Sequence, residues 1–536
     1  MNPLKTVAFV FCFFLVTTSL SAQTRVTGKV VDSQSGEPLP VRMEIISDKG
    51  IRHEAKSTDP REPALVYKRQ AGTASIEHHV TLPRGAFTVD LPPGQHTFIV
   101  QRGKEYLVET KMVAVGDKPL DLEIRLRRWI DMPSLGWYGG DVHSHRLWSE
   151  MKNLALAEDV HLSFPLSHWV TSAEAGLVSG NRIVDGYTGK PTTLMLDKNH
   201  LIHSHNAEFE IFSVKGKSHT LGAILAIGMS GVDDDRAPPL APFVDKVRER
   251  GGLTDLEKHS WPWSLAIAAT HKVDLFELAN NHVWQTRFGF PSWTIGESAP
   301  YMGLERTTQG LTEWGWIDFG FQTWYALLNC GLRIMPSAGT GSGVHPVAHG
   351  FSRVYAKTEG PLELKTWLQA LKAGKSFVTT GPLLRAEIDG KSSGETFMGP
   401  FAKPLHLRAI VHSGAPVERI EVLFNGVLIH QEWPTGCPRD EGGHDTVFSK
   451  MLSPAQSGWY VVRVFEKHPG GRVRFAHTAP WFVEVPGKPL RPRKEELEHI
   501  LGTLDREIAR NKNVLDAKSL GEIVAARDFY GRLGGN

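Results

Sequence analysis

The sequence predicts a multidomain protein in which a central α/β domain lies between two all-β domains and is followed by a helical tail. Its 536 residues are too many for a single hydrophobic core. Strand patterns separated by Gly/Pro turns fill both flanks, whereas short apolar strands alternate with helical stretches in the middle. The hydrophobic share of 41% and the charged share of 22% are typical of a soluble globular protein.

The first flank, residues 24–128, alternates apolar and polar residues in runs that break at turns such as the one at Pro92, Pro93 and Gly94. Regularly spaced strands of this kind indicate a β-sandwich. Residues 129–384 carry the alternating strands and helices, and residues 385–486 return to strands that predict a second β-sandwich. Residues 487–536 hold a linker and two stretches of helical spacing, which we expect to fold back on the body, with partial disorder as the alternative.

Residues 1–22 have the layout of a secretory signal peptide. Lys5 precedes an apolar run from Val7 to Val16, and small residues lead to Ala22. The run is too short to span a membrane, and no other stretch is long and apolar enough. We therefore expect a secreted or periplasmic protein that does not insert into the membrane after cleavage. The net charge of +2 gives no electrostatic reason to expect a nucleic-acid partner.

An H-x-H pair, His143 and His145, follows Asp141 at the end of a predicted strand. Alternate residues of a strand share a face, so both rings point the same way. Neutral imidazole binds zinc, manganese and iron, and carboxylates neutralise the charge of the ion. Alone, such a pair is more often solvated near a turn, but many of the 24 histidines of the chain crowd into the same middle region. A second pair, His203 and His205, is expected at the surface of a turn, with a place near the site as the alternative.

Two segments resemble known families. The strand and turn at residues 28–39 and the Leu-Pro-Pro-Gly hairpin at residues 91–94 are similar to carboxypeptidase regulatory-like domains. The stretch GGDVHSH, residues 139–145, resembles the first motif of the polymerase-and-histidinol-phosphatase (PHP) metallohydrolases, in particular the CehA/McbA-like branch. The stretch GKSFVTTGP, residues 374–382, resembles the closing segment of that family. The resemblance implies a distorted (β/α)7 barrel with metal ligands at its mouth.

The resemblance also implies a ligand set. Residue by residue, the family's metal-binding positions correspond to His143, His145, His168, Glu208, His219, His259 and His345. Glu210 is a rival for Glu208, because residues two apart on a strand share a face. The expected cofactor is a divalent metal, zinc, manganese or iron. The roles of His345, His168 and Asp141 are expected to be catalytic, with His345 protonating the leaving group and Asp141 also able to fix the tautomer of a histidine ring.

The chain departs from the family pattern at two positions. Ser167 and Gly343 stand where the family has aspartates. Losing these two charges predicts fewer ions than the family holds, one or two, because uncompensated positive charge in a buried pocket is costly. Asp141, Asp274 and Glu277 are the candidates for partial compensation.

These observations predict an exported metal-dependent hydrolase that uses metal-activated water, either a phosphoesterase or an ester, amide or carbamate hydrolase, with a small-molecule or glycan-type substrate. The alternative is a non-catalytic binding or scaffolding protein on a degenerate PHP barrel. The 15 tryptophans of the chain keep a carbohydrate-related role open, although core packing is the commoner use of this residue.

Overall fold

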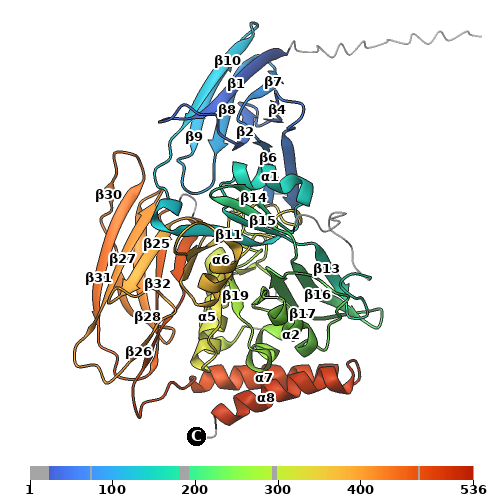
Figure 1. Ribbon diagram of the computed structural model, residues 1–536, viewed down its shortest axis with the longest axis vertical. Coiled ribbons are helices and arrows are strands. Elements are labelled where there is room, and N and C mark those ends of the chain that lie inside the picture. Colours follow the sequence, from blue (N-terminus) through green and yellow to red (C-terminus); the bar gives the residue numbers. More distant parts are fainter. Residues whose placement is uncertain (1–22, 73–74, 180–191, 293–297, 469–470, 535–536) are drawn as a thin grey trace, which may run out of the picture.

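The chain folds into a mixed α/β structure with many strands in several sheets and few helices (Figure 1). The computed structural model describes residues 23–72, 75–179, 192–292, 298–468 and 471–534. The predicted signal peptide, residues 1–22, lies outside the described residues. None of the helices in the described part combines the length and apolarity that a membrane span needs.

Residues 24–126 form two sheets at the top of Figure 1. The first has the order β10 (Leu120–Leu126), β1 (Thr24–Asp32), β7 (Phe87–Leu91), β4 (Lys56–Ser57). The second has the order β5 (Leu65–Ala71), β6 (Ser75–Leu82), β2 (Val41–Ser47), β8 (Gly94–Gln101), β9 (Glu109–Val115), with β3 (Arg52–His53) beside β2. Inward residues of both sheets, among them Val26, Phe87 and Phe98, share one apolar core. The alternating pattern of the sequence therefore produces two sheets that cover each other.

The central strands belong to two sheets. One has the order β13 (His168–Ser172), β16 (Ala207–Val214), β17 (Lys217–Ile227), β18 (Leu253–Leu256), β19 (Leu275–Ala279), β22 (Met335–Ala338). The other begins with β14 (Thr193–Asp197), β15 (His200–His203), β12 (Leu162–Pro165), β11 (Trp137–Ser144), β23 (Arg353–Lys357), β24 (Ser376–Thr379). The two sheets meet at both sides of β11. On one side β12 leads directly into β13, and on the other an isolated bridge pairs Ser144 with Ser342, just beyond β22.

The second of these sheets continues without a break into the C-terminal region. β24 pairs with β33 (Arg474–Thr478), followed by β32 (Gly458–Glu466), β28 (Val417–Phe424) and β29 (Val427–Glu432), and β34 (Trp481–Glu484) joins β32 to β26 (Thr396–Met398). A further sheet, β25 (Leu383–Ile388), β27 (Leu405–Ser413), β31 (His444–Leu452), β30 (Cys437–Pro438), packs on these strands around a second apolar core. Hydrogen-bonded pairing therefore crosses the predicted boundary between residues 384 and 385.

Helices cover the central strands. They are α1 (Trp148–Ala157), α2 (Ala241–Glu249), α3 (Trp263–Ala266), α4 (Ala268–His271), α5 (Glu313–Asn329) and α6 (Leu364–Lys372). The pair α3 and α4 forms two short helices in succession and not one continuous helix. The longest of these helices, α5, is rich in Trp and Phe. It starts where the Thr312 hydroxyl accepts a hydrogen bond of 3.0 Å from Gly315 N, and it is buried along most of its length.

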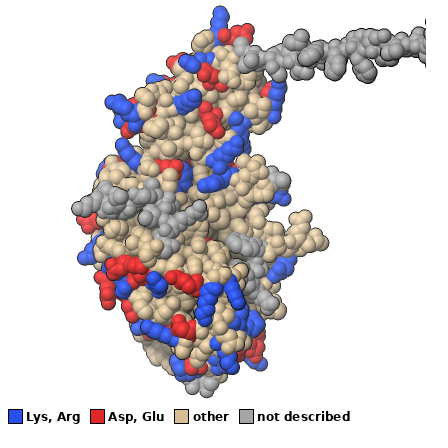
Figure 2. Space-filling model, turned by 90° about the vertical axis from the view of Figure 1, so that its right-hand side faces the viewer, with Lys and Arg blue, Asp and Glu red and all other residues tan. Residues whose placement is uncertain are grey.

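Two C-terminal helices, α7 (Lys494–Asn511) and α8 (Ala517–Leu533), lie across the bottom of the body in Figure 1. Leu497, Ile500, Leu504, Ile523 and Tyr530 insert into the central apolar core, so the tail folds back as predicted. On the face drawn in Figure 2, Lys and Arg side chains are interspersed with Asp and Glu.

Candidate metal centre

Three side chains meet at the end of β11. His143 Nε2 lies 3.2 Å from His145 Nε2 and 3.8 Å from Glu208 Oε2, and His145 Nε2 lies 3.3 Å from the same oxygen. All three residues are buried, His145 being the most exposed at 9%. The ligand atoms lie within the spacing that a single metal ion needs. The H-x-H motif and Glu208 are therefore brought together as the sequence predicts.

The second nitrogen of His143 faces two further carboxylates. Nδ1 lies 3.2 Å from Glu277 Oε1 and 3.5 Å from Glu257 Oε2. A carboxylate accepts hydrogen bonds, so the proton of the neutral ring belongs on Nδ1, and the Nε2 lone pair points toward His145 and Glu208. Such a carboxylate–histidine pair fixes the ring orientation of a metal ligand. Glu277, expected only as a compensating charge, thus orients His143.

The contacts of Lys258 show which of the two rival carboxylates, Glu208 or Glu210, faces the H-x-H pair. Its ammonium is ion-paired with Glu257 and lies 3.5 Å from Glu210 Oε1, while Trp169 Nε1 donates to Glu210 Oε2 at 3.1 Å. The lysine side chain is 1% exposed. Glu208 and Glu210 share a face of β16. Glu208 lies beside the H-x-H pair, whereas Glu210 contacts Lys258.

The local electrostatics favour a cation. Burial, reinforced by the carboxylates of Glu257 and Glu210, raises the pKa of Glu208 well above its usual value. Both oxygens of Glu208 are buried and accept no well-formed hydrogen bond from the residues that the structure describes, and the same holds for Glu257 Oε1. A divalent ion would satisfy such oxygens, and two imidazoles with a carboxylate are a donor set that zinc, manganese and iron accept. The residues fit the group that the sequence predicts.

The structure gives a reason for each of the two positions, Gly343 and Ser167, where the sequence departs from the pattern it resembles. Gly343 has φ +107°, and a Cβ placed there would lie 2.6 Å from the carbonyl oxygen of His145. An aspartate cannot occupy this position without moving the backbone of a predicted ligand. The Ser167 hydroxyl donates to Ser204 O, so this side chain holds the backbone of a neighbouring loop.

Gly339 also has a packing role, because a Cβ there would lie 2.2 Å from both Glu277 Oε1 and His143 Cβ. The close approach of the chain at this glycine lets Glu277 reach the imidazole.

Asp141 holds the loop after β22 instead of facing the three-residue cluster. Its carboxylate accepts hydrogen bonds from His143 N at 3.2 Å, Thr340 N at 3.1 Å, Thr340 Oγ1 at 2.6 Å and Gly350 N at 2.8 Å, and it lies 3.0 Å from His349 Nδ1. Burial would raise the pKa of Asp141, but His349 and these donors lower it overall. The predicted catalytic residue is a positioning residue in this structure.

The structure places two predicted ligands outside the cluster. The neighbour of His168, Trp169, contacts His145 with ring centroids 4.7 Å apart. Since successive residues of a strand alternate, the His168 side chain points to the other face, where burial and His205 lower its pKa to about 4. His219 Nε2 lies 2.8 Å from Asn511 Oδ1 of α7, at the far end of β17.

His259 and His345 lie in an aromatic wall near the cluster. Asn280 Nδ2 donates to His259 Nδ1 at 2.9 Å, and the His259 ring packs against Trp316 and Phe319 with centroid distances of 4.6 and 4.8 Å. The His345 ring lies 5.5 Å from both His282 and Trp284.

Burial, with Lys258 as the next cause, lowers the pKa of His259 and of His345 to about 3 in each case. Both rings are therefore neutral at physiological pH.

His203 of the second H-x-H pair is not at the surface position that we expected. His203 is 2% exposed, its Nδ1 lies 2.9 Å from Thr193 Oγ1, and its Nε2 lies 2.9 Å from Met229 O. Both ring nitrogens are engaged in hydrogen bonds, so His203 has a structural role. Asp274 also serves a structural contact, because its Oδ2 accepts from Thr254 N at 3.1 Å and its Oδ1 lies 2.9 Å from Lys372 Nζ.

A tyrosine of the N-terminal sheets reaches the candidate centre. The Tyr67 hydroxyl donates to His345 O and accepts from Gly343 N at 2.8 Å, and the Arg146 guanidinium lies 4.3 Å from the centroid of its ring. The N-terminal region therefore holds the loop that carries His345 and packs on His145. No local sequence motif around Tyr67 predicts this contact.

Replacing Tyr67 by Phe should loosen this loop while keeping the ring. We expect the free energy of unfolding to fall by about 1–2 kcal/mol, because the backbone N–H of Gly343 and carbonyl of His345 lose their partner. Denaturant unfolding measures the loss. Tyr460→Phe, in a buried tyrosine packed against Phe424 of the C-terminal sheets, is the control, and an equal loss in both variants would contradict the assigned role.

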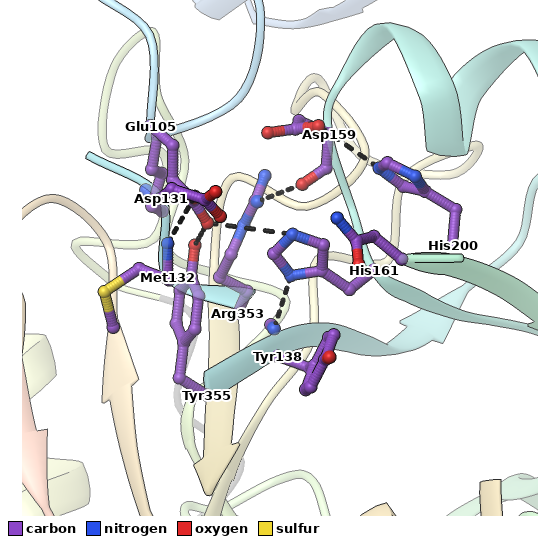
Figure 3. A network of polar contacts seen from close by, with 12 residues as sticks. Glu105, Asp131, Met132, Tyr138, Asp159, His161, His200, Arg353 and Tyr355 are labelled. Carbon is purple, nitrogen blue, oxygen red and sulfur yellow. Dashed lines mark hydrogen bonds and ion pairs between the residues drawn. The ribbon is translucent and has the colours of Figure 1, made fainter. Parts of the chain in front are cut away.

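A further group of potential ligands, Asp159, His161 and His200, lies between the N-terminal and central regions (Figure 3). Asp159 is already paired with two guanidinium groups, Arg102 at 3.1 Å and Arg128 at 3.3 Å. The His161 Nδ1 accepts a hydrogen bond of 2.8 Å from Gly139 N. Two cations at the carboxylate disfavour a metal ion, so we interpret this group as a buried polar network.

Arg353 and Glu105 complete this network. Arg353 donates to Asp159 O at 2.9 Å and Glu158 O at 3.1 Å, which are carbonyls at the end of α1. Glu105, from the N-terminal region, accepts from Met132 N at 2.9 Å and Tyr355 Oη at 3.2 Å. The network connects the N-terminal region to the strand β23 beside β11.

The comparisons with known proteins give no match to a family model, a curated protein or a solved structure. The interpretation of the centre therefore rests on its own residues. Sequence reasoning missed Glu257 and Lys258, although His259, the next residue, was singled out. The only signal was a carboxylate directly after a short buried strand, which is too common to indicate a site.

Proposed function

We propose that the chain is a metal-dependent hydrolase of the PHP type, in which His143, His145 and Glu208 hold a divalent ion. The observation that carries the proposal is the convergence of these three buried side chains, in which neither oxygen of Glu208 accepts a well-formed hydrogen bond from the described residues. The proposed fold is a distorted (β/α)7 barrel between two β-sandwiches. The step from β12 into β13 and the bridge between Ser144 and Ser342 support this, because they connect the two central sheets.

A divalent ion bound here would supply Lewis-acid activation of water for attack on a phosphorus or carbonyl centre. The residues of the chain prepare the site for it. Glu277 keeps the proton of His143 on Nδ1 and the lone pair of Nε2 directed at the ion. His345 is neutral and lies in the aromatic wall beside the centre, where we propose that it accepts the proton released by the attacking water and then passes it to the leaving group.

The test is the metal content of the mature protein, purified without added metal or a histidine tag and measured by elemental mass spectrometry. We expect about one tightly bound equivalent of zinc, manganese or iron, and hydrolysis of at least one substrate among aryl phosphates, esters and carbamates. Bound metal without hydrolysis would favour the binding-protein alternative. Failure to take up metal on reconstitution would overturn the proposal.

Metal affinity should depend on pH through His143. Burial alone would lower the pKa of His143, but the carboxylates of Glu277 and Glu257 raise it above 6.5. The ring must lose this proton to bind metal, so affinity should rise with pH through the region above 6.5 and level off. Titration calorimetry with Mn²⁺ at several pH values measures this.

Glu277→Gln is the variant that tests the cause of this pH dependence. It keeps an acceptor for Nδ1 but removes the charge, so the rise should move to lower pH and the affinity at its plateau should fall by about 10–100-fold. A variant with an unchanged pH profile would contradict the assigned pairing of Glu277 with His143.

A further inference from the structure

We propose that the ammonium of Lys258 takes the place of a second divalent cation, so that the centre binds one metal ion and not two. This inference rests on the proposed function, because it concerns the number of ions that the same site accepts. It identifies a residue that determines the stoichiometry and therefore the kind of metal chemistry available.

The first observation is the crowding of carboxylates. Glu208, Glu210, Glu257 and Glu277 are all at most 7% exposed and lie around His143 and Lys258. Buried acidic groups at this density require positive charge nearby. Lys258 meets that need for Glu257 and Glu210, which it contacts directly, while Glu208 faces the two histidines.

The second observation is that His143 and Glu257 are already engaged, the first by its lone pair and the second by the ammonium of Lys258. Among the described residues, the potential ligand group that adjoins the first one is His143, Glu257 and Glu277, which shares His143 with it. The neutral ring of His143 has one lone pair, and with the proton on Nδ1 that lone pair lies at Nε2, on the side of Glu208. The Glu257 Oε2 atom is already paired with the ammonium. An ion placed there would meet a protonated nitrogen and a cation.

Removing the lysine should therefore create a second site. In Lys258→Ala the carboxylates of Glu210 and Glu257 lose their cation, and Glu257 Oε1 has no well-formed hydrogen bond within the described chain. Without that cation, Glu210 and Glu257 offer carboxylate oxygens, the ligands that Mn²⁺ prefers, close enough to Glu208 to affect its charge.

The experiment compares metal stoichiometry after removal of metal with a chelator and reloading with excess Mn²⁺. Elemental mass spectrometry should give about one equivalent for the wild type and about two for Lys258→Ala. Electron paramagnetic resonance is the second readout, because two neighbouring Mn²⁺ ions couple and lose the hyperfine pattern of an isolated ion.

Two further variants control the comparison. Lys246→Ala removes a lysine of α2 that is ion-paired with the buried Asp235, and this variant should bind the same number of ions as the wild type. Lys258→Ala combined with Glu257→Gln removes both members of the central ion pair, so it should fold without metal and return to about one equivalent. Should Lys258→Ala alone unfold without metal, its recovery of a folded state on Mn²⁺ addition supports the inference.

The outcomes separate the inference from the proposed function. One ion in both the wild type and Lys258→Ala overturns the inference and leaves the metal site intact. Two ions in the wild type also overturn it. No ion in the wild type but one in Lys258→Ala overturns the proposed metal function while supporting the lysine as a substitute cation. No ion in either protein overturns both.

Discussion

Replacement of His143 and His145 together by alanine should abolish metal binding. The wild type is expected to retain about one equivalent after desalting and the double variant none, because the remaining ligand, Glu208, cannot hold a divalent ion tightly alone. Both rings lie within 3.8 Å of the same carboxylate oxygen. Hydrolysis should disappear together with the metal, and circular dichroism should show an unchanged fold.

The second H-x-H pair provides the matched control. Alanine at His203 and His205 also removes two histidines, from the end of β15, but the ring nitrogens of His203 are bonded to Thr193 and Met229. We expect this variant to lose some stability and to keep its metal. Full metal occupancy in the His143 and His145 variant would show that the ion is held elsewhere.

The largest effect on stability is expected at Asp159. Asp159→Asn should lower the free energy of unfolding by about 3 kcal/mol or more, because it removes the carboxylate charge between Arg102 and Arg128 within a buried network. Asparagine keeps the size of the side chain and tolerates the positive φ of 49° at this residue. Denaturant unfolding at neutral pH provides the measurement.

Asp197→Asn tests the same network from its exposed side. Asp197 Oδ1 lies 2.8 Å from His200 Nδ1, but its side chain is 46% exposed, so its removal should cost less than about 1 kcal/mol. Equal losses in the two variants would mean that burial of the Asp159 ion pairs contributes nothing specific. Metal content should stay unchanged in both, since we do not expect the Asp159, His161 and His200 group to hold an ion.

Much of the fold follows from periodicity. The alternating strands of residues 24–126 and the two C-terminal helices have strong local patterns, and the structure has these elements where the patterns predict them. The pairing of β24 with β33 could not be predicted in this way, because it joins segments about a hundred residues apart whose local sequences read as separate domains.

The site is predictable only where a motif fixes geometry. In the H-x-H pair the alternation of a strand places both rings on one face, and the structure brings them together. His168 and His219 have no such internal constraint, and their surroundings, a neighbouring tryptophan on the opposite face and an asparagine of α7, are set by the tertiary fold. Lys258 and Tyr67 are ordinary residues in their local sequences and become part of the centre only through distant contacts.

The unbroken sheet from β14 to β29 has a consequence for how the chain is made. A protein cut after residue 384 would end with β24 as an exposed edge strand, whose unpaired N–H and C=O groups invite association with other chains. During synthesis the central region emerges first and must wait for residues 474–478 before that edge is covered. The C-terminal strands therefore cover an edge that the region carrying the candidate metal centre would otherwise expose.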